Sequence, residues 1–321
     1  MSDWKPLKRT GALLCAVTLI GVYSTSAQAV PRASNSAEDV SALIADVAPD
    51  QGLITNEHES AWDPSDDGRV RLNPEPQSLS TARPSAAAST KDSSTSPIEI
   101  SLPTGSSTAQ AETASDGTLV YSGEDGVDIA VQLVGSDSVR IHSVSHDDVG
   151  SQEFAYTFSE GTRLVETDSG KIDVLQQSGP ALVKVGEIDA PWAVDAAGSP
   201  VATNYRIEGR SLIQEVHPTE DVTYPIVADP KVTSTWWNRT VYFNKQETLM
   251  IAAGAGGCAS VAGLIPEPTV SKVIAAACGL LSAYASGITA SGSCLKAVHY
   301  LHQPTPVPQP YGGSEAGGYC R

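Results

Sequence analysis

The sequence predicts an α+β protein, in which an antiparallel β meander or sandwich is followed by a disulfide-stapled α-helical hairpin and preceded by a disordered N-terminal leader. Three observations predict this class. Short runs of β-forming residues recur at intervals of about ten residues across 117–230. Two long uncharged stretches with helical spacing follow them. All cysteines beyond an expected export signal lie within residues 258–320, where they can link those helices.

The N-terminus has the form of an export signal. Basic residues precede the apolar run 11–22, and small residues stand at Ala27 and Ala29, as a signal peptidase requires. The apolar run is too short to remain in a bilayer as a span. We therefore expect a signal peptide over residues 1–29, cleavage between Ala29 and Val30, and a secreted or cell-envelope-associated mature protein.

The mature chain is acidic, and its charge is unevenly distributed. The full chain has a formal net charge of −17, and removing residues 1–29, which carry three basic and one acidic side chain, makes it −19. Residues 231–321 hold six basic and three acidic side chains, a balance of +3, so residues 30–230 carry −22. Nucleic-acid binding needs clustered Lys and Arg, so this balance argues against a nucleic-acid partner and favours solubility outside the cell.

Residues 30–116 are predicted to be a disordered acidic leader. The region is rich in Ser, Thr, Ala and Pro and poor in aromatic residues, so it offers little apolar area to offset the entropy of ordering. One short helix is expected near residues 37–48, because Ser36 can cap it and four aliphatic residues from Val40 to Val47 recur at helical spacing. A helix this short needs a surface to pack on.

Residues 117–230 are predicted to form an antiparallel β domain. Turn residues separate the runs, for example at 135–138 and 168–170, and apolar and polar side chains alternate from Val139 onward, as in a strand with one buried face. Trp192, in a longer turn segment, is expected to fill the core. The predicted strands are the runs TLVYS, VDIAVQLV, SVRIHSV, EFAYTFS, TRLVET, KIDVLQQ, ALVKVGEI, NYRIEG, SLIQEV and YPIVAD.

Residues 231–321 are predicted to form a disulfide-linked helical hairpin with a Pro/Gly-rich tail. After an extended segment, 237–243, Asn244 and Glu247 have the spacing of a capping box, so the first helix should begin there. It should end near Pro266–Pro268, and the second helix should follow directly.

Four cysteines remain after removal of the signal. An even number in an exported chain indicates two disulfides, for which three connectivities exist, whereas a zinc site would favour closely spaced cysteine pairs that this sequence lacks. Folding the helices about the Pro266–Pro268 turn brings Cys258 and Cys278 to heights that differ by about 3 Å, within reach of a disulfide. Cys294 would then pair with Cys320 and hold the tail against the hairpin.

No motif for catalysis, a cofactor or a metal stands out. The segment Gly254–Ala259 fits G-x-G-x-x-A, but the capping box places its glycines within a helix instead of after a buried strand. His142 and His146 are expected to be solvated residues of a strand and its turn. His299 and His302 are expected in a solvated turn of a C-terminal helix, and neither pair completes a metal site. We expect no catalytic residue, no cofactor and no metal.

Membrane contact through residues 248–295 is an alternative that the sequence disfavours. The uncharged stretches 248–266 and 273–295 are each long enough to span hydrocarbon. Gly, Ala, Ser and Thr dominate them, however, and Leu and Ile are few, which argues against stable insertion. Small residues also let helices approach closely, as a soluble hairpin requires.

Several segments together resemble a group of uncharacterised exported proteins from actinomycetes. The resemblance rests on the four tail cysteines and on the segments APWAVDAAG, YPIVADP, TVYFNKQET and the closing YGG…GYCR. It implies export and this architecture, a β module of the YPIVADP type with a four-cysteine helical tail, and it implies no activity.

Two functional hypotheses follow. The first is a secreted non-enzymatic protein that acts as an interaction module for an unknown extracellular or cell-envelope partner. The second is a membrane-active or toxin-like C-terminal hairpin that the acidic N-terminal region restrains, which the charge difference between the two regions motivates.

Overall fold

The computed structural model describes residues 36–48, 62–65, 68–72, 98–103, 111–123, 126–134, 137–147, 150–235 and 237–321. The predicted signal peptide and its cleavage site at Ala29 and Val30 lie outside the described residues. Residues 35–321 cluster as one unit.

Two antiparallel sheets make up the β region, as the sequence predicts, and each of the ten predicted runs forms a strand. The six-stranded sheet contains β1 (Trp62–Ser65), β2 (Arg69–Leu72), β3 (Ile98–Ser101), β8 (Gln152–Phe158), β14 (Ser211–His217) and β13 (Ala202–Glu208), in that order. The thirteen-stranded sheet has the order β19 (Val307–Tyr311), β18 (Cys294–Tyr300), β17 (Asn238–Phe243), β11 (Ala181–Ile188), β16 (Lys231–Ser234), β7 (Ser138–Ser145), β6 (Val127–Val134), β5 (Leu119–Ser122) and β4 (Glu112–Thr113), with β9 (Thr162–Glu166), β10 (Ile172–Ser178), β12 (Ala193–Val194) and β15 (Ile226–Ala228) paired beside this path.

Alternation along the strands places one apolar face of each sheet in a shared core. Ile100 of β3 and Phe158 of β8 come from the smaller sheet, and Ile141 of β7 and Val183 of β11 come from the larger one. All four side chains are almost completely buried in the same apolar cluster. The β region is therefore a sandwich, the second of the two forms that the sequence allows.

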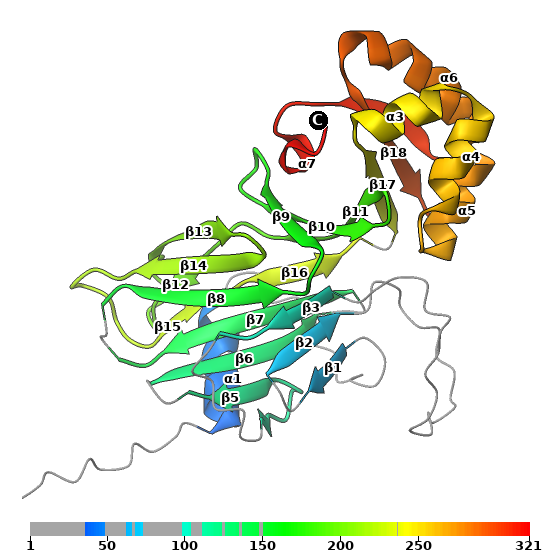
Figure 1. Ribbon diagram of the computed structural model, residues 1–321. Coiled ribbons are helices and arrows are strands. Elements are labelled where there is room, and N and C mark those ends of the chain that lie inside the picture. The colour runs from blue at the N-terminus through cyan, green and yellow to red at the C-terminus, as the bar shows by residue number, and fades with distance from the viewer. Residues whose placement is uncertain are drawn as a thin grey trace, which may run out of the picture. The chain divides into compact units, whose positions relative to one another are not determined.

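The outer face of the larger sheet is covered by a helix from the predicted leader. Helix α1 (Ala37–Val47) begins at a capping box formed by Ser36 and Asp39 and contacts β4, β5 and β6 (Figure 1). Ile44 of this helix is fully buried in a second apolar cluster, against residues such as Val120 and Ala130. The sheet is the packing surface that the short helix needs.

The short helix expected near residues 37–48 of the leader is confirmed, but the prediction of disorder over the rest of 30–116 is wrong for its other described segments. Besides α1, strands β1 to β4 come from this region, and β2 and β3 place four fully or nearly buried aliphatic side chains in the shared core. Sequence composition missed them because short strands need pairing partners from elsewhere in the chain, and β3 finds its partner in β8. The rest of the predicted leader lies outside the described residues.

The segment YPIVADP crosses the middle of the larger sheet. Strand β15 pairs with one half of β7 and strand β16 pairs with the other half. Asp229 and Pro230 interrupt the ladder between them, and the Ile141 amide donates to the Pro230 carbonyl at 2.9 Å. The sheet thus continues through residue 231, where the sequence analysis placed a domain boundary.

Four helices, and not two, lie between β17 and β18 along the chain. Helices α3 (Lys245–Ala252), α4 (Ala255–Gly263), α5 (Pro268–Ala276) and α6 (Cys278–Ile288) gather beside β17 and β18 (Figure 1), and a 3-10 turn, η1 (Thr289–Ser291), follows them. The first predicted helix is broken at Gly254, whose φ of 118° is open to glycine but strained for other residues. The second is broken at Ala277. The predicted capping box of Asn244 and Glu247 is present at the start of α3.

The last part of the chain returns to the sheet. Residues 294–300 and 307–311, which the sequence analysis assigned to a helix end and a Pro/Gly-rich tail, form β18 and β19. Strand β18 pairs with β17, so the four helices form a connection in the chain between two strands that are neighbours in the sheet. A short turn of helix, α7 (Glu315–Gly318), precedes the C-terminus.

Candidate functional site

The four tail cysteines form the two predicted disulfides, and both hold the C-terminal unit, which we define as residues 237–321. Cys258 pairs with Cys278, and Cys294 pairs with Cys320. This is the connectivity expected from folding the helices about the proline turn. Disulfides of this kind are consistent with an extracellular or otherwise oxidising environment.

The disulfide between Cys258 and Cys278 lies inside the helical layer. It joins α4 to the first residue of α6, and both cysteines are buried in the shared apolar core. Small residues allow the close packing around it: a side chain at Gly257 would overlap the Met250 carbonyl of α3. The glycine-rich stretch therefore serves helix packing, and its glycines do not follow a buried parallel strand as a dinucleotide site requires.

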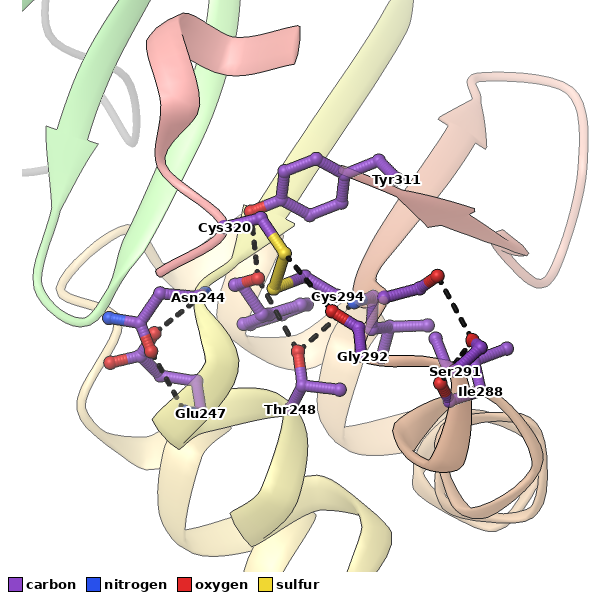
Figure 2. Close-up of a disulfide and its surroundings, with 12 residues drawn as sticks. Asn244, Glu247, Thr248, Ile288, Ser291, Gly292, Cys294, Tyr311 and Cys320 are labelled. Carbon is purple, nitrogen blue, oxygen red and sulfur yellow. Dashed lines mark hydrogen bonds between the residues drawn. A yellow bond between two sulfur atoms is a disulfide. The ribbon is translucent and has the colours of Figure 1, made fainter. Parts of the chain in front are cut away.

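The disulfide between Cys294 and Cys320 lies between β18 and the chain end. Cys294 is fully buried, whereas Cys320 is partly exposed. Figure 2 shows the bond beside Tyr311 and Thr248. The Tyr311 hydroxyl donates to the Phe243 carbonyl at 2.8 Å, and the Thr248 hydroxyl accepts from the Leu295 amide at 3.0 Å, so β17, α3, β18 and β19 are tied together around it.

Residues 312–321, which we call the C-terminal segment, lie against the β9–β10–β11 end of the larger sheet. The Tyr319 hydroxyl donates to the Pro180 carbonyl at 2.9 Å, and the Arg163 guanidinium lies 5.7 Å from the centre of the Tyr319 ring. Lys296 forms an ion pair with Glu315. Beneath the segment, a small apolar cluster is closed by Ala316 and consists of Leu175, Leu182, Tyr242, Cys294 and Tyr311.

All large apolar side chains that are exposed among the described residues lie in the C-terminal unit. Four of them lie at the same end of β17, β18 and β19, and we call these four residues the aromatic patch. Tyr300 is paired with Asn238, the residue after Trp237, and the Leu301 amide donates to the Trp237 carbonyl at 3.0 Å. The patch consists of Trp237, Tyr300, Leu301 and Val307, which are between 40% and 51% exposed.

The aromatic patch is not among the features that the sequence predicts. In the sequence, Trp237 precedes one β-forming stretch and Tyr300 ends another. The two residues are seen to be close only when these stretches are paired as β17 and β18. The surroundings are also distinctive, because neither 232–246 nor 294–314 contains an acidic residue in a strongly acidic chain. Exposed aromatic and aliphatic side chains with few acidic neighbours are typical of interaction surfaces.

The predicted histidine pairs lie elsewhere than expected. His142 is on β7 but is completely buried instead of solvated, and His146 contacts the Asp128 carboxylate at 2.7 Å. His299 lies on strand β18 and not on a helix, and its Nε2 lies 3.1 Å from the Gln303 carbonyl.

A chain of hydrogen bonds connects the buried His142 to α1. His142 Nε2 donates to the Gln132 side-chain oxygen at 3.1 Å, and the Gln132 amide donates to the Thr118 hydroxyl at 3.1 Å. The Thr118 and Ser41 hydroxyls both donate to Asp116, at 3.0 and 2.6 Å. Burial, with a further contribution from the nearby Arg140, lowers the pKa of His142 to about 3. The histidine is therefore a neutral structural group that helps to hold α1 on the sheet.

The carboxyl of Asp229 is strongly perturbed by its surroundings. Burial, reinforced by the charge of Asp189 and opposed by hydrogen bonding to Trp192 and by Arg140, raises its pKa to about 8. It accepts from the Trp192 amide at 3.4 Å. Trp192 itself is half-buried and packs on the outer-face cluster beside α1, with its ring 5.9 Å from that of His142, and not in the core between the sheets where it was expected. This environment keeps Asp229 neutral at the heart of the YPIVADP segment.

The described residues contain no group of three or more His, Cys, Asp or Glu side chains that is arranged to hold a metal ion. Over the same part of the chain, no single helix has the length and apolarity to cross a membrane. The pair formed by Pro268–Ala276 and Cys278–Ser291 meets both conditions together but is bent by 73°.

The chain matches no protein-family model and no curated protein. Among solved structures, it has a distant similarity to a heparan sulfate lyase HepC mutant from Pedobacter heparinus, with 6% sequence identity and a TM-score of 0.23. That similarity covers 66% of this chain and 28% of the lyase chain, so the chain spans less than a third of the lyase's length. The fold and the site thus define the class on their own: a two-sheet antiparallel β protein that carries a disulfide-linked helical unit.

Proposed function

We propose that this chain is a secreted, non-enzymatic interaction protein, and that its C-terminal unit binds an extracellular or cell-envelope partner. The observation that carries the proposal is the aromatic patch: four partly exposed apolar residues at one end of β17, β18 and β19, two of which, Trp237 and Leu301, are joined by a backbone hydrogen bond. The export signal expected over residues 1–29 and the two disulfides support an extracellular location.

The residue types in the patch suit a binding role. Trp and Tyr combine a large apolar area with a polar group at the edge and dominate the energetics of many interfaces. A folded protein in water exposes such groups singly more often than in a group. Two rigid strands and their hydrogen-bonded ends hold this group in place, so a partner would meet a preformed surface.

The neighbouring sheet edge favours a partner that docks on side chains. Strand β19 is an edge strand with prolines at 308 and 310, which have no amide hydrogen. The amide groups that β19 donates to β18 must therefore come from residues 307, 309 and 311. Residues 308 and 310 occupy the positions whose amides would face away from β18, and as prolines they offer no hydrogen there. This arrangement discourages the addition of a further strand, so the contact we propose is made by side chains.

The proposal is tested by measuring saturable binding of the labelled mature protein to envelope fragments of the exporting cells. The double variant Trp237→Ser/Leu301→Ser should weaken binding roughly tenfold or more, as the loss of two central apolar contacts does in other interfaces. Leu249→Ser is the matched control, because Leu249 is 60% exposed on α3 and outside the patch. Equal binding by all three proteins would reject the patch, and turnover of a substrate that is lost in Asp229→Asn would indicate an enzyme instead.

A membrane-active C-terminal unit is the second candidate. It is favoured by the bent helix pair of α5 and α6 and by the exposed Leu264 and Leu280 at the ends of neighbouring helices. Insertion would require this layer to open, because the buried Cys258–Cys278 bond ties α4 to α6. Release of dye from anionic vesicles by residues 231–321, suppressed by adding the acidic residues 30–230, would support this candidate, and no release by the oxidised 231–321 would exclude it.

A further inference from the structure

We propose that the disulfide between Cys294 and Cys320 is a thiol-exchange site, at which a dithiol reductant releases the C-terminal segment from the sheet. The substrate class is a small or protein dithiol, and the released element is residues 312–321. This inference is independent of the proposed binding function, because it concerns a different surface of the C-terminal unit.

The two disulfides differ in their access to solvent. Exchange requires a thiolate to approach one sulfur along the sulfur–sulfur axis, so a buried bond is protected. Cys258 and Cys278 are 0% and 5% exposed and are enclosed by the helical layer. Cys320 is partly exposed at the chain end, whereas its partner Cys294 is fully buried in β18. Of the four cysteines, Cys320 is therefore the one with solvent exposure at which an incoming thiolate can attack.

The chemistry balances with a dithiol alone. Its thiolate attacks the Cys320 sulfur, forms a mixed disulfide and expels the Cys294 thiolate, which takes up a proton. The second thiol of the reductant loses its proton and attacks its own sulfur in the mixed disulfide, which expels Cys320 as a thiolate that is then protonated. The protein disulfide gains two electrons and two protons, and the dithiol is oxidised to a disulfide.

Apart from the contacts of the Tyr319 side chain with Pro180, Gln177 and Arg163, the non-covalent contacts of the C-terminal segment are weak. Arg163 donates to the Ala316 and Gly317 carbonyls at 3.5 and 3.3 Å, both long distances, and the ion pair of Lys296 with Glu315 is partly exposed. Ala316 has a φ of 52°, a left-handed conformation that is unfavourable for a residue with a side chain. Ala316 is the one fully buried residue of the segment, and only Tyr319 and Cys320 pack beside it as partly buried side chains, so the apolar burial that holds the segment without the covalent bond is limited.

Release would uncover an apolar surface. The cluster beneath the segment contains Leu175 and Leu182 of the β10–β11 hairpin and Tyr242 of β17, all of them buried in the oxidised protein. Tyr242 and Tyr311 pack edge to face with ring centres 5.1 Å apart, and Tyr311 belongs to β19 and stays in place. Reduction would therefore remove the cover of a preformed surface without dismantling the sheet.

The test is a titration of the native mature protein with dithiothreitol, followed by alkylation and mapping of the labelled cysteines. Cys294 and Cys320 should become labelled together, about tenfold or more faster than Cys258 and Cys278. At that stage chymotrypsin should cleave after Tyr319 and binding of a hydrophobic dye should rise. Release of all four thiols in one step, or continued protection of Tyr319 after Cys294 and Cys320 are labelled, would overturn the proposal.

Two variants separate the covalent bond from the contacts around it. Cys294→Ser/Cys320→Ser should show the cleavage and the dye binding without any reductant. Tyr319→Phe, which removes the bond to the Pro180 carbonyl but leaves the disulfide, should remain protected from dye binding until it is reduced. If the double variant folds and stays as protected as the oxidised wild type, the disulfide does not control the segment. If it fails to fold, the titration of the wild type still decides the question.

Discussion

Replacing Asp229 with asparagine should change how the stability of this protein depends on pH. Asp229 has a folded-state pKa of about 8, raised by burial from 3.8, and His142 has one of about 3, lowered by burial from 6.5. Stability rises with pH where the unfolded chain binds more protons than the folded one, and falls where it binds fewer. The two groups act in opposite directions, and their pH windows overlap only in part.

Between about pH 4 and pH 6.5 the contributions of Asp229 and His142 to the pH dependence of stability cancel. The unfolded chain holds one proton on His142, and the folded chain holds one proton on Asp229, so the pair contributes no slope. From pH 6.5 to pH 8 only the Asp229 proton of the folded state remains, and the stability that it contributes is lost as the pH rises. At about 1.4 kcal/mol per pH unit, this loss is about 2 kcal/mol across that window.

The side chain introduced by Asp229→Asn would be neutral at every pH and could still accept the hydrogen bond from the Trp192 amide. The variant should therefore lose the decline between pH 6.5 and pH 8, and below pH 6.5 it should show the rise with pH that His142 produces alone. The difference in unfolding free energy between variant and wild type should grow by about 1.4 kcal/mol per unit from pH 4 to pH 8 in favour of the variant.

Urea denaturation of the oxidised protein at half-unit steps from pH 5 to pH 9, followed by tryptophan fluorescence, measures this difference. Asp168→Asn is the control, because Asp168 is exposed in the turn between β9 and β10. Parallel stability curves for wild type and Asp229→Asn between pH 6.5 and pH 8 would refute the assignment of a neutral, buried Asp229.

Three further sets of substitutions test the packing. A side chain at Gly256 would meet no atom within 4 Å, so Gly256→Ala should raise the unfolding free energy by about 0.5–1 kcal/mol. A side chain at Gly257 would overlap the Met250 carbonyl, so Gly257→Ala should lower it by about 1–3 kcal/mol. If urea unfolding shows changes of the same sign for both variants, the close approach of α3 and α4 is contradicted. Gly179 and Gly209 both have a positive φ, so substitution of either by alanine should lower the unfolding free energy by about 1–2 kcal/mol. A side chain at Gly179 would in addition overlap the Leu264 carbonyl, so Gly179→Ala should cost more than Gly209→Ala. An equal loss would show that the β10–β11 turn does not touch the end of α4. Ile44→Ala should lower the unfolding free energy by about 2–5 kcal/mol, because its side chain is fully buried under α1, and an unchanged denaturation midpoint would mean that α1 is not docked.

Local patterns predicted much of the β region. Strands such as β6, β7 and β11 are encoded by β-branched residues bounded by turns, and the capping box at Asn244 is contained within four residues. The disulfide pairing also followed from local geometry, because the rise of a helix and the position of a proline turn place Cys258 beside Cys278. In each case the information lies within a short stretch of chain.

The errors fell where a partner distant in sequence decides the outcome. Strand β18 alternates weakly and was assigned to a helix end, but β17 offers it an edge to pair with. The leader strand β3 is too short to be recognised alone and pairs with β8. His142 was expected in solvent because its strand alternates like one with a single buried face, yet α1 and Trp192 cover the second face as well. Burial of this kind depends on what arrives from elsewhere in the chain.

The sequence by itself determined the class of fold, the positions of most strands, the helix cap and the pairing of cysteines, because turn chemistry, side-chain periodicity and helix rise act over a few residues. Only the tertiary structure decided which faces are buried, how the pKa values of Asp229 and His142 are displaced, and that Trp237 and Leu301 lie side by side. Those properties arise from desolvation and from contacts between segments far apart along the chain, and a single stretch of sequence does not contain them.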